Sequence, residues 1–181
     1  SARDAVAAPA PVRIVLDLTT TANNRSLYSG ICRVEESLAP ALAATPGVEI
    51  RYVYWPDRAT GFVDVPASVA GRGLVAEFRD CGDATEPVFD ADWVGARFVV
   101  VGSSWMQNGD YARAAVDFAA TKQLELCALM HDLTPHLFPH WFADGYSAVF
   151  VDNMTALLRG TDRILVYSDS TRADVEALAA E

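Results

Sequence analysis

The chain has 181 residues, of which 51% are hydrophobic and 21% are charged, and its formal net charge is -10. A folded chain of this size buries roughly 70% of the surface that its unfolded form exposes, so it can form a core without disulfides or metals. The composition excludes disordered, collagen-like and disulfide-scaffold proteins. The acidic balance, with 14 cationic residues scattered singly, excludes a nucleic-acid partner and electrostatic docking to an anionic membrane.

Cysteine usage and hydropathy indicate the cellular compartment. Cys32, Cys81 and Cys127 lie far apart and form no CxxC pair, as expected of reduced thiols in the cytosol. No window of about eighteen apolar residues predicts a membrane span, and the first residues lack the order of a signal peptide. We therefore expect a cytoplasmic protein without a transmembrane segment, and peripheral contact with the inner face of the membrane is compatible with the sequence.

The first part of the chain predicts a strand, a helix and a second strand. Residues 1–11 are a Pro/Ala-rich lead-in that we expect to be mobile. Apolar runs predict buried strands over residues 12–18 and 48–55. Between them, apolar residues at helical spacing predict a helix that ends before Pro46–Gly47, with a face formed by Ile31, Val34, Leu38 and Leu42.

Residues 56–92 are irregular because glycine and proline break every period, although residues 68–78 could hold one short helix. Strand and helix patterns then alternate again. Thr171 to Asp174 matches a capping box, so Ser170 or Thr171 is expected to cap the last helix. Strands are predicted at 97–102, 124–130 and 163–167, and helices at 111–121, at 147–159 and from Thr171 onward.

Five strands, of which the later ones are each separated by a helix, define the predicted fold class. They indicate an α/β protein with a Rossmann-like three-layer α/β/α arrangement and a mainly parallel sheet. We expect residues 12–181 to form one domain of this kind.

Polar residues collect after the predicted strands. In a doubly wound sheet, ligands bind beyond the carboxyl ends of the strands, where helix N-termini point their amides into the crevice. Four such segments converge in this prediction, and the crevice candidates among them include Ser103, Ser104, Trp105 and Ser168. The segments are 17–30, 102–107, 131–135 and 168–170.

Ser29 and Gly30 stand at the start of the first helix, where a glycine lets a phosphate or carboxylate approach free amides. A plain helix start is the alternative, since the full GxGxxG dinucleotide pattern is absent. Arg33 lies one turn into the same helix and could supply a fork for an anion. Its alternative is a surface ion pair with Glu36 or Glu35.

All three histidines fall within ten residues. His131, at a strand end beside Asp132, is well placed as a hydrogen-bonding group of the crevice. The spacing H-x4-H-x3-H matches no zinc signature, so we expect no metal site. His136 and His140 are interpreted as loop packing within an aromatic cluster, for which a sugar platform and an acyl-chain contact are the alternatives. The other aromatic members of that loop are Phe138, Trp141 and Phe142.

Several catalytic fingerprints are missing from the chain. It contains no G-x-S-x-G nucleophile elbow, no GxxxxGK[ST] P-loop and no H-E-x-x-H motif. Hydrolase, NTPase and metalloprotease functions therefore lose their usual sequence support.

Three motifs occur in order and carry a family resemblance: Ser29-Gly-Ile-Cys-Arg-Val34, His131-Asp-Leu-Thr-Pro135 and Tyr167-Ser-Asp-Ser-Thr-Arg-Ala-Asp174. Over residues 12–180 the chain resembles the amino-terminal domain of retaining glycosyltransferases of the GT-B fold, in family 4, which builds bacterial polysaccharides and glycolipids. Each motif is weak alone, and the signal lies in their order and spacing.

The resemblance implies a two-domain enzyme in which this half holds a glycan or lipid-linked acceptor and a carboxy-terminal half, absent from the sequence, grips a nucleotide-sugar donor. It places Ser29, Gly30 and Arg33 at the donor diphosphate, and it places His131 at the donor sugar. Asp132 and Ser168 match motif positions that line the crevice. It also implies transfer with retention of configuration, with no cofactor and no required metal.

Without the second half, the chain by itself should lack full donor binding and turnover. The alternative from another class is a non-catalytic Rossmann-like binding or assembly module. A free-standing nucleotide-dependent enzyme is a third reading, which the missing phosphate fingerprints disfavour.

Overall fold

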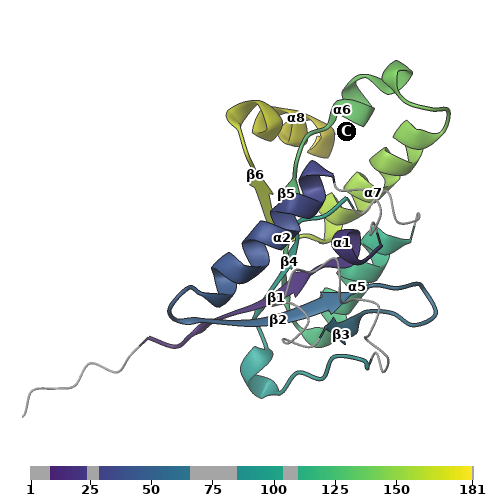
Figure 1. Cartoon of the computed structure of the whole chain (residues 1–181). Coiled ribbons are helices and arrows are strands. Elements are labelled where there is room, and N and C mark those ends of the chain that lie inside the picture. The colour runs from purple at the N-terminus through teal and green to yellow at the C-terminus, as the bar shows by residue number, and fades with distance from the viewer. Residues whose placement is uncertain (1–8, 24–28, 66–84, 104–109, 181) are drawn as a thin grey trace, which may run out of the picture.

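The computed structural model describes residues 9–23, 29–65, 85–103 and 110–180. Within these ranges the chain forms one six-stranded sheet with helices around it (Figure 1). The elements are β1 (Val12–Asp17), α1 (Thr19–Asn23), α2 (Gly30–Ala43), β2 (Val48–Tyr54), β3 (Val63–Val65), η2 (Ala91–Trp93), β4 (Arg97–Val100), α5 (Tyr111–Lys122), β5 (Glu125–Met130), α6 (Thr134–Leu137), η4 (Pro139–Trp141), α7 (Tyr146–Gly160), β6 (Arg163–Val166) and α8 (Asp169–Ala179).

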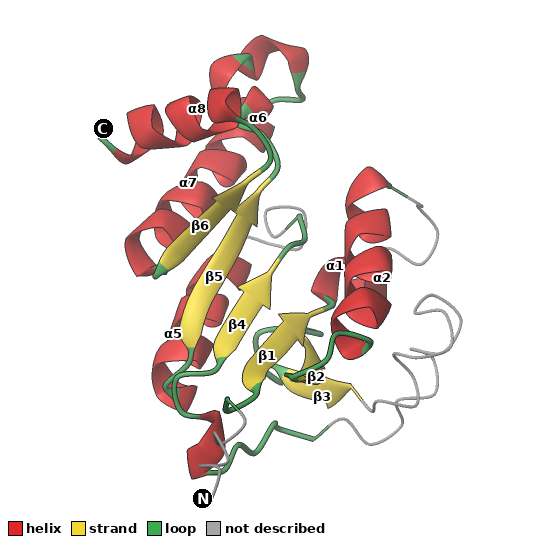
Figure 2. Ribbon diagram, turned by 90° about the vertical axis from the view of Figure 1, so that its left-hand side faces the viewer, coloured by secondary structure: helices red, strands yellow, loops and turns green. Residues whose placement is uncertain are grey.

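The strand order is β3-β2-β1-β4-β5-β6, and every neighbouring pair is parallel except β2 and β3. This confirms the predicted Rossmann-like α/β fold. The chain leaves β1 toward β2 on one side and later returns to β4 on the other, so the sheet has its topological switch point between β1 and β4. The arrowheads of the parallel strands point to one edge, and α6 and α8 lie beyond those of β5 and β6 (Figure 2).

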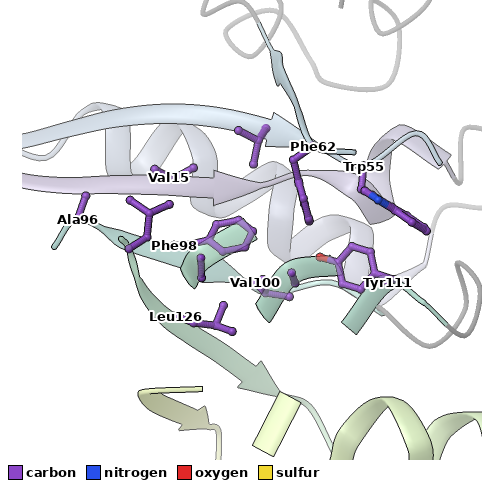
Figure 3. Close-up of a cluster of buried hydrophobic side chains, with 12 residues drawn as sticks. Val15, Trp55, Phe62, Ala96, Phe98, Val100, Tyr111 and Leu126 are labelled. Atoms are coloured by element: carbon purple, nitrogen blue, oxygen red, sulfur yellow. The ribbon is translucent and has the colours of Figure 1, made fainter. Parts of the chain in front are cut away.

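Alternating side chains of β1 enter two different cores, which is why the sheet is covered on both faces. Leu16 packs on the face covered by α2, together with Ala39. Val15 faces the other side and packs in a cluster with Phe98 and Ala115 of α5 (Figure 3). A third cluster joins β5 to α7 and α8, with Ala128, Met130, Phe150, Met154 and Val175. Figure 2 shows α2 on one side of the sheet and α5 and α7 on the other.

The structure corrects the sequence prediction at two places. The sheet has six strands, because the short strand β3 pairs antiparallel with β2 inside the segment predicted to be irregular. The last helix begins at Asp169, and its cap is Ser168, whose hydroxyl accepts the N–H of Thr171 at 3.1 Å. The predicted capping box at Thr171 is therefore wrong, because the helix starts two residues earlier.

Other predictions fall partly outside the described residues. They are the short helix at 68–78 and residues 1–8 of the lead-in. Within the described ranges, no helix is both long enough and apolar enough to cross a membrane.

Candidate functional site

Asp17 ends β1 at the switch point, and its side chain is fully buried. The carboxylate accepts hydrogen bonds from the Thr19 N–H at 3.1 Å, from the Thr19 hydroxyl and from the Tyr111 hydroxyl. Burial raises the pKa of Asp17 to about 6, although the hydrogen bonds from Thr19 and Tyr111 act in the opposite direction. The three donors therefore favour the ionised form of Asp17, whereas its burial opposes that form.

The threonines of α1 join the ends of three strands. The Thr19 hydroxyl oxygen accepts the N–H of Trp55, which directly follows β2, at 2.8 Å. The Thr20 hydroxyl oxygen accepts the N–H of Ser103, in the turn after β4, at 2.9 Å. Because α1 itself follows β1, these bonds fix the carboxyl ends of β1, β2 and β4 relative to one another.

Glu35 points from α2 into the same buried region and has no exposed surface. Its Oε2 accepts the N–H of Thr21 at 2.7 Å, whereas its Oε1 has no hydrogen-bond partner. Burial, and next the nearby charge of Asp17, raise the pKa of Glu35 to about 8. Each of the two buried carboxyl groups therefore opposes ionisation of the other.

His131 occupies the carboxyl end of β5. Its Nε2 lies 2.6 Å from the carbonyl oxygen of Val101 at the end of β4, and its ring centroid lies 5.5 Å from that of Tyr167 after β6. A carbonyl oxygen only accepts, so Nε2 carries the proton of this bond. Among the described residues, Nδ1 has no hydrogen-bond partner. The bond to Val101 thus fixes the ring and leaves Nδ1 at the strand ends.

Two helices that begin at this edge are capped by serines. The hydroxyl of Ser29 accepts the N–H of Cys32 at 3.3 Å at the start of α2, and Ser168 caps α8. Gly30 is exposed, and a Cβ built on it would meet nothing within 4 Å, so the described residues leave space beside the start of α2. Such N-termini favour anions through their free amides and the helix dipole.

The residues predicted to bind phosphate or to line the crevice differ in their exposure, and two of them are not described. Ser29, Gly30 and Arg33 are all exposed on the first turn of α2. Ser103 is buried and donates its amide to Thr20, so its backbone supports the crevice wall. Ser104 and Trp105 lie outside the described residues.

The structure also bears on the surroundings of Asp132 and Arg33. Asp132 accepts the N–H of Thr134 at 2.9 Å and thereby closes the turn into α6. Of the two surface partners expected as an alternative for Arg33, Glu35 is fully buried, whereas Glu36 is partly exposed and that ion pair stays a prediction. The structure therefore brings His131 to the ends of β4 and β6, and it places Asp132 at the first turn after β5.

The aromatic loop after β5 is less buried than the packing interpretation predicts. Phe138 and Trp141 stack with ring centroids 4.4 Å apart, but 40% and 65% of their surfaces are exposed. His140 contacts the edge of Trp141, and Phe142 stacks on Tyr146. The loop thus presents an aromatic pair to solvent beyond the edge of the sheet.

No group of three or more potential metal ligands occurs among the described histidine, cysteine, aspartate and glutamate residues. A cavity of about 450 Å³ lies beside α5, with Trp55, Phe62 and Phe118 among its lining residues. None of the predicted site residues lines this cavity. The candidate site at the strand ends therefore consists of the backbone amides that begin α2 and α8 and of the side chains around His131.

Sequence reasoning missed the buried pair of acids and the tyrosine that binds one of them. One signal for Glu35 was present: it lies four residues after Ile31 and three before Leu38, so it falls on the predicted apolar face of α2. A charged residue in such a stripe is expected to have a special environment. Tyr111 carried no comparable signal, because its partner Asp17 is distant in the sequence.

No protein-family model matches this chain, and no curated protein matches it significantly.

Proposed function

We propose that the chain is the acceptor-side domain of a retaining glycosyltransferase of the GT-B type, which transfers a sugar from a nucleotide-sugar donor to a glycan or lipid-linked acceptor. The observation that carries the proposal is the position of His131. Its ring is fixed by the Val101 carbonyl and Tyr167 at the ends of three parallel strands, on the edge from which the amides of α2 are reached.

In the proposed reaction, an acceptor hydroxyl attacks the anomeric carbon from the face that the diphosphate leaves. The new C–O bond forms as the bond to the phosphate oxygen breaks, and the hydroxyl proton passes to the departing diphosphate. Amides at Ser29–Gly30 would stabilise the charge that develops on that leaving group. His131 would accept a hydrogen bond from the donor sugar through Nδ1 and so orient the reacting carbon.

The test is turnover in a protein that contains both the acceptor-side and the donor-side halves. His131→Ala should lower kcat by about 100-fold or more, the scale of losing a group that orients or stabilises the transition state. His140→Ala is the matched control, since it removes the same side chain from an exposed site on the neighbouring loop. Unchanged turnover of folded His131→Ala would refute the proposed role.

The alternative, a non-catalytic assembly module, is favoured by one specific feature. The edge strand β6 carries Ile164 and Leu165 with 36% and 46% of their surfaces exposed, and no described strand pairs with its outer side. Titration of the chain with a nucleotide-sugar and with oligosaccharides, followed by calorimetry, separates the two proposals. Binding of neither ligand, together with tight binding of a protein partner at β6, would favour the module.

A further inference from the structure

The stacked rings of Phe138 and Trp141 form an exposed aromatic surface that takes no part in the proposed reaction. The two rings are nearly parallel, at 11°, and their centroids lie 4.4 Å apart, so each ring covers one face of the other. Even so, 65% of the surface of Trp141 is exposed. The outer face of its indole ring is therefore open to solvent.

The backbone beneath this pair is held in place by buried anchors and by hydrogen bonds. Leu133 and Pro135 are buried at the start of α6. The N–H of Phe138 donates to the Thr134 carbonyl at 2.9 Å, and the N–H of Trp141 donates to the Phe138 carbonyl at 3.0 Å. An aromatic pair on a fixed backbone is a preorganised surface, so little conformational entropy is lost when a ligand binds to it.

The charge around the pair favours an uncharged ligand. The sequence has no lysine or arginine in residues 123–158, whereas Asp132 and Asp144 stand on either side of the aromatic residues. Helix α8 begins at the same edge of the sheet, and its one cation, Arg172, forms an ion pair with Asp169 at 2.9 Å. Anionic phospholipids and anionic glycans are attracted by clustered cations, which this surface does not offer.

An open indole face beside an acidic side chain fits a neutral sugar. The C–H bonds on one side of a pyranose ring carry partial positive charge and pack against the negative face of an aromatic ring. Asp144 is exposed three residues after Trp141, and its carboxylate can accept hydrogen bonds from sugar hydroxyls. A segment that lies in a membrane interface typically has lysine or arginine beside its apolar residues, and here those are absent from residues 123–158.

The pair belongs to the chain segment that carries His131. Only residues 132–137 separate His131 from Phe138, and α6 takes up the last four of them. With a rise of about 1.5 Å per helical residue and at most about 3.8 Å for every other step, the two positions are less than about 20 Å apart. That span corresponds to a few sugar units.

We propose that the open face of Trp141, backed by Phe138, is a subsite for an uncharged sugar of the acceptor, a few units away from the hydroxyl that reacts. The inference rests on the proposed function and names the acceptor as a neutral oligosaccharide chain. Trp141 is a binding residue in this role, and it takes no part in the chemical step.

Titration of the whole chain with neutral oligosaccharides, followed by NMR, tests the subsite. The probes are maltohexaose, cellohexaose and mannohexaose, which differ in sugar and in linkage. At least one of them should bind in the millimolar range or more tightly. Its binding should shift the indole N–H resonance of Trp141 more than that of any other tryptophan.

Two substitutions separate ring stacking from simple apolar contact. Trp141→Leu keeps an apolar side chain without the aromatic face and should weaken binding by about tenfold, whereas Trp141→Tyr should stay within about threefold of the wild type. Because Trp141 is mostly exposed, both variants should fold, which circular dichroism checks. Val94→Ala is the control: it removes exposed apolar surface before β4, at the opposite end of that strand, and should bind as the wild type does.

Three outcomes would overturn the inference. One is that none of the three oligosaccharides binds, and another is equal binding by Trp141→Leu and the wild type. The third is a Trp141 resonance that responds to phosphatidylglycerol vesicles or to rising protein concentration in place of oligosaccharide. That result would assign the surface to a membrane or to a second copy of the chain.

The titration contains no nucleotide-sugar, so failure of this inference is distinguishable from failure of the proposed function. In a protein with both halves, Trp141→Leu should raise the KM for an oligosaccharide acceptor by about tenfold and leave kcat at saturating acceptor nearly unchanged. Full transfer with an unchanged acceptor KM would refute only the subsite. Oligosaccharide binding at Trp141 in a protein that transfers no sugar would refute only the transferase.

Discussion

The turn after β4 leaves no room for a side chain at Gly102, and Gly102→Ala measures how rigid the crevice wall is. The added Cβ would lie 2.9 Å from the Cβ of Thr20 and would overlap Thr20 Oγ1 and Glu35 Oε1. Thr20 cannot move freely, because its hydroxyl oxygen accepts the Ser103 amide. The substitution must therefore displace the turn, α1 or α2.

The expected cost follows from these contacts. Overpacking of a well-packed site costs about 1–3 kcal/mol, and weakening the bond to the Ser103 amide adds about 1 kcal/mol. Alanine also lowers the conformational entropy of the unfolded chain, which offsets about 0.4–1 kcal/mol of this cost. We expect the free energy of unfolding to fall by about 1–3 kcal/mol.

Urea unfolding followed by circular dichroism measures this change. The free energy of unfolding falls by about 1–3 kcal/mol per M of urea, so the urea concentration at the midpoint of unfolding should be lower by roughly 1 M in the variant. Gly30→Ala is the matched control, because its Cβ meets nothing within 4 Å and it lies in the first turn of a helix. That control should be neutral or more stable by up to about 1 kcal/mol. Equal midpoints for Gly102→Ala and the wild type would refute the close packing.

Three further predictions concern stability. Tyr111→Phe removes a donor from buried Asp17 and should destabilise the fold by about 1–3 kcal/mol in denaturant unfolding at pH 7. Ser168→Ala removes the cap of α8 and should cost about 1 kcal/mol by thermal melting. The pKa of Glu35 is about 8 in the folded chain and 4.5 for an ordinary glutamate, so the native state binds the proton more tightly than the unfolded state. As the pH rises from 4.5 to 8, the free energy of unfolding should therefore fall by at most about 1.4 kcal/mol per pH unit, measured by denaturant unfolding at several pH values.

The spacing of apolar residues predicted most of the helices and strands, because the apolar residues that repeat at helix or strand spacing are also the ones that form the core. Helix α2 begins one residue before the first predicted apolar position, and β5 lies within its predicted range. The strand β3 escaped prediction since three residues cannot show an alternation against a background rich in glycine and proline. Its antiparallel pairing with β2 is a tertiary contact that local sequence does not encode.

The candidate site was predicted at its strand ends and missed in its interior. Position after a parallel strand is enough to place His131 and Ser29 at one edge, because all carboxyl ends meet there. The buried contacts required the fold: Tyr111 reaches Asp17 across 94 positions of sequence, and Ser103 reaches Thr20 across 83. The cap at Ser168 was also missed in favour of Ser170 or Thr171, because the hydroxyl of each of these residues can accept from a helix amide.

The charge beneath the crevice has a direct bearing on an anionic ligand. Asp17 holds one negative charge at the switch point, and ionisation of Glu35 would add a second. Each such charge opposes an anion at the strand ends, because like charges repel and a buried charge is screened less than an exposed one. A proton on Glu35 removes that opposition without a lysine or arginine. The amides of α2 can then act on a diphosphate against one buried charge instead of two, which is why a neutral glutamate fits the proposed donor site better than an ionised one.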